Sequence, residues 1–150
     1  MQAIMPPYQF GRRSMAKIKH VAITCEDPDA VAKFYKEGFD LFEVARNARQ
    51  IQLSDGDINL TILKWKTNED ADVGPNGENY DGIHHIGFQV DSLEETGAKL
   101  REIDGEEIVR REVAGDGQPR PPRAEEKWSG PNGQVLDISE PGWLHKPAMD

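Results

Sequence analysis

Residues 83–100 read IHHIGFQVDSLEETGAKL, and residues 18–35 read IKHVAITCEDPDAVAKFY. The two stretches align without a gap at an offset of 65 residues, and each places a histidine third, His20 in the earlier copy and His85 in the later one. Both copies open with the alternation of apolar residues that is typical of a β-strand. We infer an internal repeat, in which one structural unit occurs twice along the chain.

Each copy continues into the signals of a helix start. Asp27 followed by Pro28 supplies a side-chain cap and a proline at the first helical position. Ser92 supplies the cap in the second copy, with an acidic residue three positions later. The two helices are expected to end near Gly38 and Gly105. Their core-facing residues are predicted to be Val31, Phe34 and Tyr35 in the first helix and Leu93, Leu100 and Ile103 in the second.

Three strand-like runs follow each helix, and the last two runs of each set are joined by a turn signal, Asp-Gly at residues 55–56 and Asn-Gly at residues 132–133. The runs cover residues 41–46, 50–54 and 58–63 in the first half and residues 107–113, 125–129 and 134–139 in the second. The chain is therefore predicted to be one domain over residues 16–140, built from two strand–helix–strand–strand–strand modules. These modules cover residues 16–64 and 82–140.

The two ends of the chain differ from this regular pattern. Residues 1–15 are expected to form a loose N-terminal extension, and residues 141–150 a C-terminal tail. Trp143 and Leu144 are expected to dock on the domain, because a bare tryptophan in a tail is unusual. The two longest loops are predicted at residues 66–81 and 114–124, and loops of this length are often lids or flexible segments.

Composition narrows the classes of function. The 150 residues include 18 Lys and Arg against 27 Asp and Glu, a formal net charge of −9, which disfavours a nucleic-acid partner. No stretch approaches the roughly 18–20 apolar residues of a membrane helix. Cys25 is the only cysteine, so an intrachain disulfide and a cysteine-based zinc site are excluded. A single cysteine is compatible with a reducing compartment, and we expect a cytoplasmic protein.

These features resemble the vicinal oxygen chelate superfamily, which includes glyoxalase I, methylmalonyl-CoA epimerase, extradiol ring-cleaving dioxygenases and the bleomycin- and fosfomycin-resistance proteins. The resemblance rests on the paired modules, on IKHV at residues 18–21, on HHIGF at residues 84–88 and on PNGQVLDI at residues 131–138. It covers residues 16–140. It implies an α+β fold, in which two βαβββ modules form a curved, partly closed mixed sheet around a cavity with the helices outside.

The resemblance also implies a metal site. In this superfamily the ligands project inward from the first and last strands of each module, which assigns them to His20, His85 and Asp137, the last where the family usually has Glu. Thr61 falls at the remaining position. Because threonine is a poor ligand for a divalent metal, Thr61 is a candidate for binding the substrate instead. Two imidazoles and one carboxylate suit iron, zinc, manganese, nickel or cobalt and leave open positions for substrate or water.

Other residues are weaker candidates. Trp65 and Trp128 are predicted to flank the cavity as aromatic walls, although ordinary packing explains them equally well. Arg49 is a candidate for binding an anionic group of the substrate, and Glu126 is a candidate general base. His84 is expected to point to the opposite face of its strand from His85, and so to pack near the helix or bind a carboxylate.

Three functions fit these residues. We favour a metal-dependent, glyoxalase-like lyase or isomerase that chelates a small substrate through vicinal oxygens and stabilises an enediolate. The second is an extradiol dioxygenase-like Fe(II) enzyme, which would need no fourth ligand. The third is a bleomycin-resistance-type protein that binds a small molecule without catalysis. The resemblance further implies a homodimer.

Overall fold

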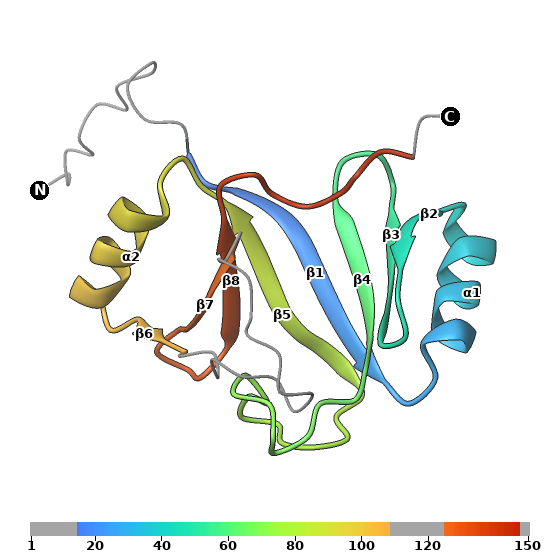
Figure 1. Cartoon of the computed structure of the whole chain (residues 1–150), viewed down its shortest axis with the longest axis horizontal. Helices are drawn as coiled ribbons and strands as arrows, with labels where there is room; N and C mark the ends of the chain where they lie inside the picture. The colour runs from blue at the N-terminus through green and yellow to red at the C-terminus, as the bar shows by residue number, and fades with distance from the viewer. Residues whose placement is uncertain (1–14, 109–124, 148–150) are drawn as a thin grey trace, which may run out of the picture.

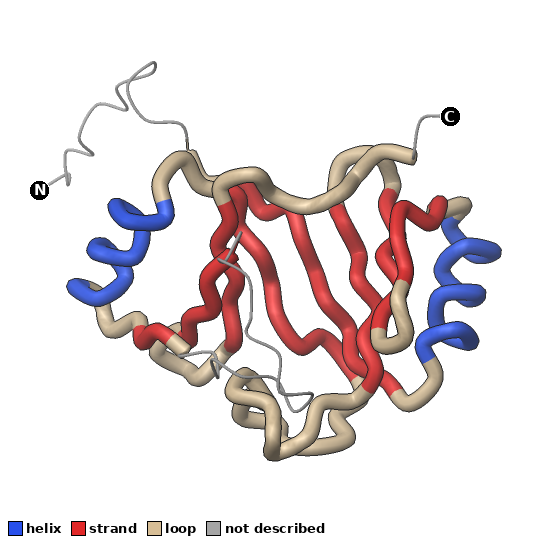
Figure 2. The backbone as a smooth tube through the Cα atoms, viewed as in Figure 1, coloured by secondary structure: helices blue, strands red, loops and turns tan. Residues whose placement is uncertain are grey.

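The computed structural model describes residues 15–108 and 125–147. Within them the chain forms one eight-stranded mixed sheet in the order β2-β3-β4-β1-β5-β8-β7-β6, flanked by two helices (Figures 1 and 2). The elements are β1 (Lys17–Cys25), α1 (Pro28–Phe39), β2 (Phe42–Arg46), β3 (Gln50–Ser54), β4 (Asn59–Lys64), β5 (Gly82–Gln89), α2 (Leu93–Glu102), β6 (Glu106–Glu107), β7 (Glu125–Ser129) and β8 (Val135–Ser139). The predicted α+β fold is confirmed.

The sheet keeps the symmetry of the repeat. β1 pairs in parallel with β4 in the first module, and β5 pairs in parallel with β8 in the second. The two modules meet where β1 and β5 run antiparallel at the centre of the sheet. The first strand of each module is therefore interior to the sheet, and β2 and β6 form its edges.

Both helices begin where the sequence predicts. The Asp27 carboxylate accepts a hydrogen bond from the backbone N–H of Ala30, and the Ser92 hydroxyl accepts one from Glu95. Each cap satisfies an N–H group that has no partner inside its helix. α1 ends at Phe39, where Asp40 adopts a left-handed conformation with φ 57°. The predicted helix starts and approximate ends are confirmed.

Each helix covers its own apolar cluster on one face of the sheet. Under α1 the buried residues are Cys25, Ala32, Ile51, Leu53 and Ile62, and under α2 they are Val90, Trp128 and Ile138. Two of the predicted core residues are not buried, because Phe34 is 62% exposed and Ile103 is 66% exposed. Phe34 lies at the edge of the apolar stripe of α1 and packs edge-on against Tyr35, while Ile103 follows the last residue of α2.

The opposite face of the sheet is polar. Strand alternation places His20, Asn59, Thr61, His85 and Asp137 there, and all five side chains are buried. The predicted loop at residues 114–124 and most of the predicted N-terminal extension, residues 1–14, lie outside the described residues. Among the described residues, no helix is both long enough and apolar enough to cross a membrane.

Candidate metal centre

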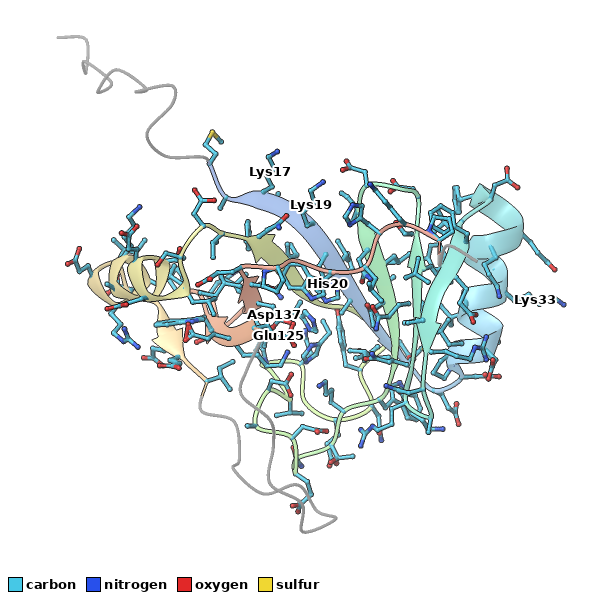
Figure 3. All side chains as sticks on the ribbon, turned by 45° about the horizontal axis from the view of Figure 1, so that its top comes forward. Lys17, Lys19, His20, Lys33, Glu125 and Asp137 are labelled. Carbon is cyan, nitrogen blue, oxygen red and sulfur yellow. The ribbon has the colours of Figure 1, made fainter. Side chains whose placement is uncertain are left out.

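Three side chains from three strands converge on the polar face. His20 comes from β1, His85 from β5 and Asp137 from β8, and their ligand atoms all lie within 4.8 Å of one another. Their residues are 4%, 3% and 1% exposed. Figure 3 shows His20 and Asp137 close to the middle of the sheet. The structure thus brings together the three residues predicted as metal ligands.

The strand register shows why Thr61 occupies the position of a possible fourth ligand. Ala22 pairs with Thr61 in the first module, and Gly87, its counterpart in the repeat, pairs with Asp137 in the second. Thr61 therefore occupies in the first module the place that Asp137 occupies in the second. Its hydroxyl donates to Asn59 Oδ1 at 2.6 Å, so Thr61 takes part in the hydrogen bonding around the site.

The neighbours of His20 determine which of its ring nitrogens carries the proton. The Asn59 side-chain amide donates from Nδ2 to the backbone carbonyl of Leu144 at 2.7 Å, and a carbonyl can only accept. Asn59 Oδ1 therefore faces His20 Nδ1 at 2.8 Å and accepts its proton. Burial lowers the pKa of His20 below its usual value, so the ring is neutral and its Nε2 keeps a free electron pair.

His84 contacts Nδ1 of His85, as Asn59 contacts Nδ1 of His20. A β-bulge pairs Ala22 with His85 but Ile23 with Ile83, which leaves His84 as the extra residue and breaks the alternation of β5. The prediction that His84 points away from His85 is therefore wrong: the Nδ1 atoms of the two rings are 2.8 Å apart, and both residues are buried.

The proton positions in this histidine pair follow from one carbonyl. His84 Nε2 lies 3.2 Å from the backbone oxygen of Val73, to which it donates. Burial lowers the pKa of His84 and of His85, so both rings are neutral, and His84 Nδ1 accepts the proton of His85 Nδ1. His85 Nε2 is left with a free electron pair.

The resulting donor set fits a divalent metal. His20 Nε2 and His85 Nε2 are 3.1 Å apart with no proton between them, and Asp137 Oδ2 is 3.1 Å from His85 Nε2. Electron pairs that face one another at this separation repel unless a cation lies among them. Two imidazole nitrogens and one carboxylate oxygen are common ligands of zinc, iron and manganese, and each histidine has its other nitrogen held by a partner, as metal-ligating histidines usually do.

Asp137 also belongs to a chain of ion pairs. Lys127 Nζ lies 2.9 Å from Asp137 Oδ1 and 3.3 Å from Asp72, and Lys66 lies 3.0 Å from Asp72. Burial opposes the ionisation of Asp137, but the ammonium group of Lys127 beside it outweighs burial and holds its pKa well below the usual range. Burial likewise opposes the ionisation of Asp72, while Lys66 and Lys127 lower its pKa to about 2. These ion pairs connect loop 66–81 to the site, and they compensate the negative charge of Asp137.

Two of the weaker candidates lie on the wrong face. Glu126 pairs with Ile138 and Trp128 with Leu136, so both point toward the core under α2, where Trp128 is completely buried. The sequence does not reveal this face, because the five residues of β7 show no clear polar–apolar alternation. Glu125, one residue earlier, lies on the polar face instead.

The remaining candidates lie away from the three predicted ligands. Trp65 donates from Nε1 to Asp81 at 2.7 Å, across the base of loop 66–81. Arg49 is exposed in the turn between β2 and β3. Both residues lie near the ends of β1 and β4 at Cys25 and Lys64, whereas His20 lies nearer the start of β1.

Sequence reasoning missed His84, Lys127 and Trp143 as parts of the site. Strand alternation places Asn59 on the cavity face beside Thr61, but Thr61 was preferred there and Asn59 was given no role. Lys127 and Trp143 carry no local signal, because their neighbours at the site come from distant parts of the chain. Trp143 docks on His20 as a tail tryptophan is expected to dock, whereas the side chain of Leu144 is 56% exposed, contrary to prediction.

Fold and site together define a duplicated βαβββ protein with a His-His-Asp centre between its modules. The model of the Glyoxalase/Bleomycin resistance protein/Dioxygenase superfamily matches residues 17–119. The match spans more than half of the chain, and the chain belongs to this superfamily. The resemblance stated from the sequence is thereby confirmed.

Solved structures of epimerases are similar to the chain over nearly its whole length. A methylmalonyl-CoA epimerase in complex with methylmalonyl-CoA and NH4+ is 25% identical with a TM-score of 0.56, covering 90% of this chain and 100% of that chain. A Streptomyces coelicolor methylmalonyl-CoA epimerase variant with 2-nitronate-propionyl-CoA is 25% identical with a TM-score of 0.57, covering 89% and 100%. The Mycobacterium tuberculosis enzyme, at 16% identity, a TM-score of 0.57 and 88% of each chain, shares the fold. Among curated proteins no sequence matches.

Proposed function

We propose that this protein is a metal-dependent lyase or isomerase that moves a proton on the carbon next to a carbonyl group. The observation that carries the proposal is the convergence of two ring nitrogens, His20 Nε2 and His85 Nε2, with the Asp137 carboxylate. These three residues would hold the metal. A metal held by them would polarise a carbonyl chelated through two neighbouring oxygens and so would acidify the adjacent C–H bond.

The residues around this centre have distinct roles in the proposal. Asn59 and His84 hold the proton of each ring on Nδ1, so that Nε2 stays available. Lys127 keeps Asp137 ionised and oriented through contacts to both carboxylate oxygens. Glu125 lies on the same face, two residues along β7 from Lys127, and we assign to it the role of proton acceptor that the sequence suggested for Glu126.

The similar solved structures suggest which substrates to test first. Two of them, each 25% identical to this chain, contain an acyl-coenzyme A ligand, methylmalonyl-CoA in one and 2-nitronate-propionyl-CoA in the other. Epimerisation next to a thioester carbonyl is a proton transfer of the proposed kind. We therefore propose an isomerase acting on a small 2-substituted acyl compound, with a glyoxalase-like lyase as the related possibility.

The direct test has two stages. The purified protein is stripped with chelator, reloaded with zinc, cobalt, nickel or manganese, dialysed, and analysed for bound metal. We expect one metal per chain in the natural sequence and none after His20→Ala or His85→Ala. Failure of the natural protein to retain any of these metals would contradict the proposal.

The second stage measures chemistry. The loaded protein is incubated with methylmalonyl-CoA in D2O, and loss of the signal of the proton on the substituted carbon is followed by NMR. Glu125→Gln should slow exchange at least 100-fold while retaining metal, and the matched Glu126→Gln should exchange as fast as the natural protein. Equal rates for the two variants would remove Glu125 from the proton-transfer role.

One specific observation favours a second candidate. Two histidines and one carboxylate, with threonine rather than a fourth ligand, match the ligand set of non-haem Fe(II) oxygenases. Iron retention with oxygen uptake on catechols, and no proton exchange, would establish this alternative instead.

We also propose a homodimer. Ile18 and Ile83 are 56% and 53% exposed, and they occupy equivalent positions at the start of the repeat, in the two central strands. Sedimentation equilibrium of the full chain tests the proposal, and a monomer at micromolar concentration would contradict it.

A further inference from the structure

Residues 140–147, which we name the C-terminal strap, cross from the second module to the first. Figure 1 shows this segment leaving the end of β8, passing β5 and β1, and reaching the β3 and β4 side of the sheet. It contains no helix or strand. Its course therefore depends on individual contacts, and these contacts lead to the metal centre.

The strap is anchored in both modules. At its start, Gln89 donates to the Glu140 carbonyl at 3.1 Å, and the backbone N–H of Leu93 donates to the Glu140 carboxylate at 2.9 Å. At its far end, the carbonyl of His145 lies 3.1 Å from the Ser54 hydroxyl, which shares its one proton between this carbonyl and that of Ile58 at 2.8 Å. The segment between these anchors is held across the polar face of the sheet.

Trp143, between the anchors, lies flat against the first predicted ligand. Its ring is parallel to the His20 imidazole within 6°, with the ring centroids 4.7 Å apart. Its Nε1 donates to the carboxylate of Glu125 in β7 at 3.1 Å, so the ring is also fixed by a strand of the second module. Gly87 makes room for this arrangement, because a Cβ there would come within 2.7 Å of both Trp143 and the Cβ of His20.

Leu144, the next residue of the strap, affects His20 indirectly, through Asn59. The carbonyl of Leu144 accepts from Asn59 Nδ2 at 2.7 Å and thereby fixes which end of that amide faces His20. If the amide rotated by 180°, Nδ2 would face His20 Nδ1, and the proton of the ring would move to Nε2. Strap contacts therefore set both the plane of the His20 ring and the nitrogen that carries its proton.

We infer that the C-terminal strap is part of the metal centre and that Trp143 is a positioning residue, which holds His20 with Nε2 directed at His85 and Asp137. The inference rests on the proposed function for its metal-binding consequence. The orientation of His20 can be measured without any metal.

The first experiment measures zinc and cobalt affinity by competition with a chromophoric chelator, using the full chain. Trp143→Ala should weaken both affinities by about 10- to 100-fold, the usual effect of removing a group that orients a metal ligand. Trp143→Phe keeps an aromatic plane beside His20 and should stay within about threefold of the natural protein. Lys146→Ala, in the same strap but exposed, is the matched control and should leave both affinities unchanged.

The second experiment uses metal-free protein. Stacking under an indole ring shifts the carbon-bound protons of an imidazole upfield in NMR spectra, and nitrogen shifts report the protonated ring nitrogen. We expect His20 to be neutral and protonated on Nδ1, and its ring protons to move downfield in Trp143→Ala. Trp143→Leu, which keeps bulk but not aromaticity, serves as the second variant if the alanine variant does not fold.

The two experiments separate the two proposals. Metal affinity in Trp143→Ala equal to that of the natural protein would overturn the positioning role. If the natural protein binds no metal, the proposed function fails, and the NMR comparison still decides the role of the strap. Unchanged His20 shifts in both the alanine and leucine variants would then overturn it.

Discussion

The two modules present equivalent histidines but hold them by different means. In the first module, His20 is held by neutral groups: the Asn59 amide at Nδ1 and the Trp143 ring on its face. In the second module, His85 is held by another histidine, His84, and stands beside an ionised carboxylate. The repeat therefore preserves where the ligands lie, while the groups around them differ between its copies.

The difference is largest at the paired positions Thr61 and Asp137. The first module presents a hydroxyl there and the second a carboxylate, so all the anionic charge of the predicted ligand set comes from one side. That charge is compensated by Lys127, which in turn contacts Asp72 of loop 66–81. The duplicated scaffold therefore places a side chain at the same position in both modules. Only the second module needs a compensating lysine, because only there is the side chain a buried carboxylate.

Substitution at this pair should give the largest effect. Asp137→Asn should abolish metal retention and destabilise the fold by about 3 kcal/mol, because Lys127 loses its closest partner in a buried site. Thr61→Val should retain metal and cost about 1 kcal/mol, the value of one hydrogen bond. Metal analysis after dialysis and urea unfolding measure both effects. Metal loss in Thr61→Val would show that the hydroxyl is itself a ligand and that the modules are more alike than proposed.

Substitution of the two Nδ1 partners should give an intermediate effect. Asn59→Ala and His84→Ala each release one ring nitrogen of a predicted ligand, and each should weaken metal affinity by about 10- to 100-fold without abolishing it. Asn59→Ala should also lower the melting temperature more, because it frees the far end of the strap. Chelator competition and thermal unfolding distinguish these results. Metal affinity unchanged in His84→Ala would mean that His85 needs no partner to expose Nε2.

Substitution of Asp72, which pairs with Lys66 and Lys127, should destabilise the fold less than Asp137→Asn, and the effect should depend on pH. The pKa of Asp72 falls from its ordinary 3.8 to about 2 in the folded protein, so its contribution to stability is complete above pH 4 and is lost as the pH falls toward 2. Asp72→Asn should therefore cost on the order of 2 kcal/mol near neutral pH. The gap between the two proteins should narrow below pH 4, as urea unfolding at a series of pH values would show.

The buried histidines also make stability depend on pH, in the natural protein and in Asp72→Asn alike. His20, His84 and His85 have lowered pKa values, mainly because burial disfavours the charged ring. The unfolded chain takes up protons at these residues below about pH 6.5, so stability should fall there in both proteins alike. A gap between natural protein and Asp72→Asn that stays constant down to pH 2 would contradict the assigned role of Asp72.

Individual residues show which features of the fold and site could be predicted from the sequence. His20 and His85 repeat at one offset, and the resemblance to the superfamily assigned these two residues and Asp137 as ligands. His84 was assigned to the wrong face, since a bulge in β5 defeats simple alternation, and the uneven pattern of β7 left the face of Glu126 undetermined. Phe34 and Ile103 were assigned to the core because apolar spacing does not show how wide a stripe a helix buries.

The sequence by itself determined the duplicated unit and the helix starts, because each depends on local periodicity and on capping by near neighbours. The three converging residues followed from the resemblance of the sequence to the superfamily. Only the tertiary structure decided how the site is held. Asn59 contacts Leu144, which lies 85 residues away along the chain, and Lys127 contacts Asp72, which lies 55 residues away. Such contacts leave no periodic trace in the sequence, since they arise where separate strands, a loop and the strap fold onto the same face of the sheet.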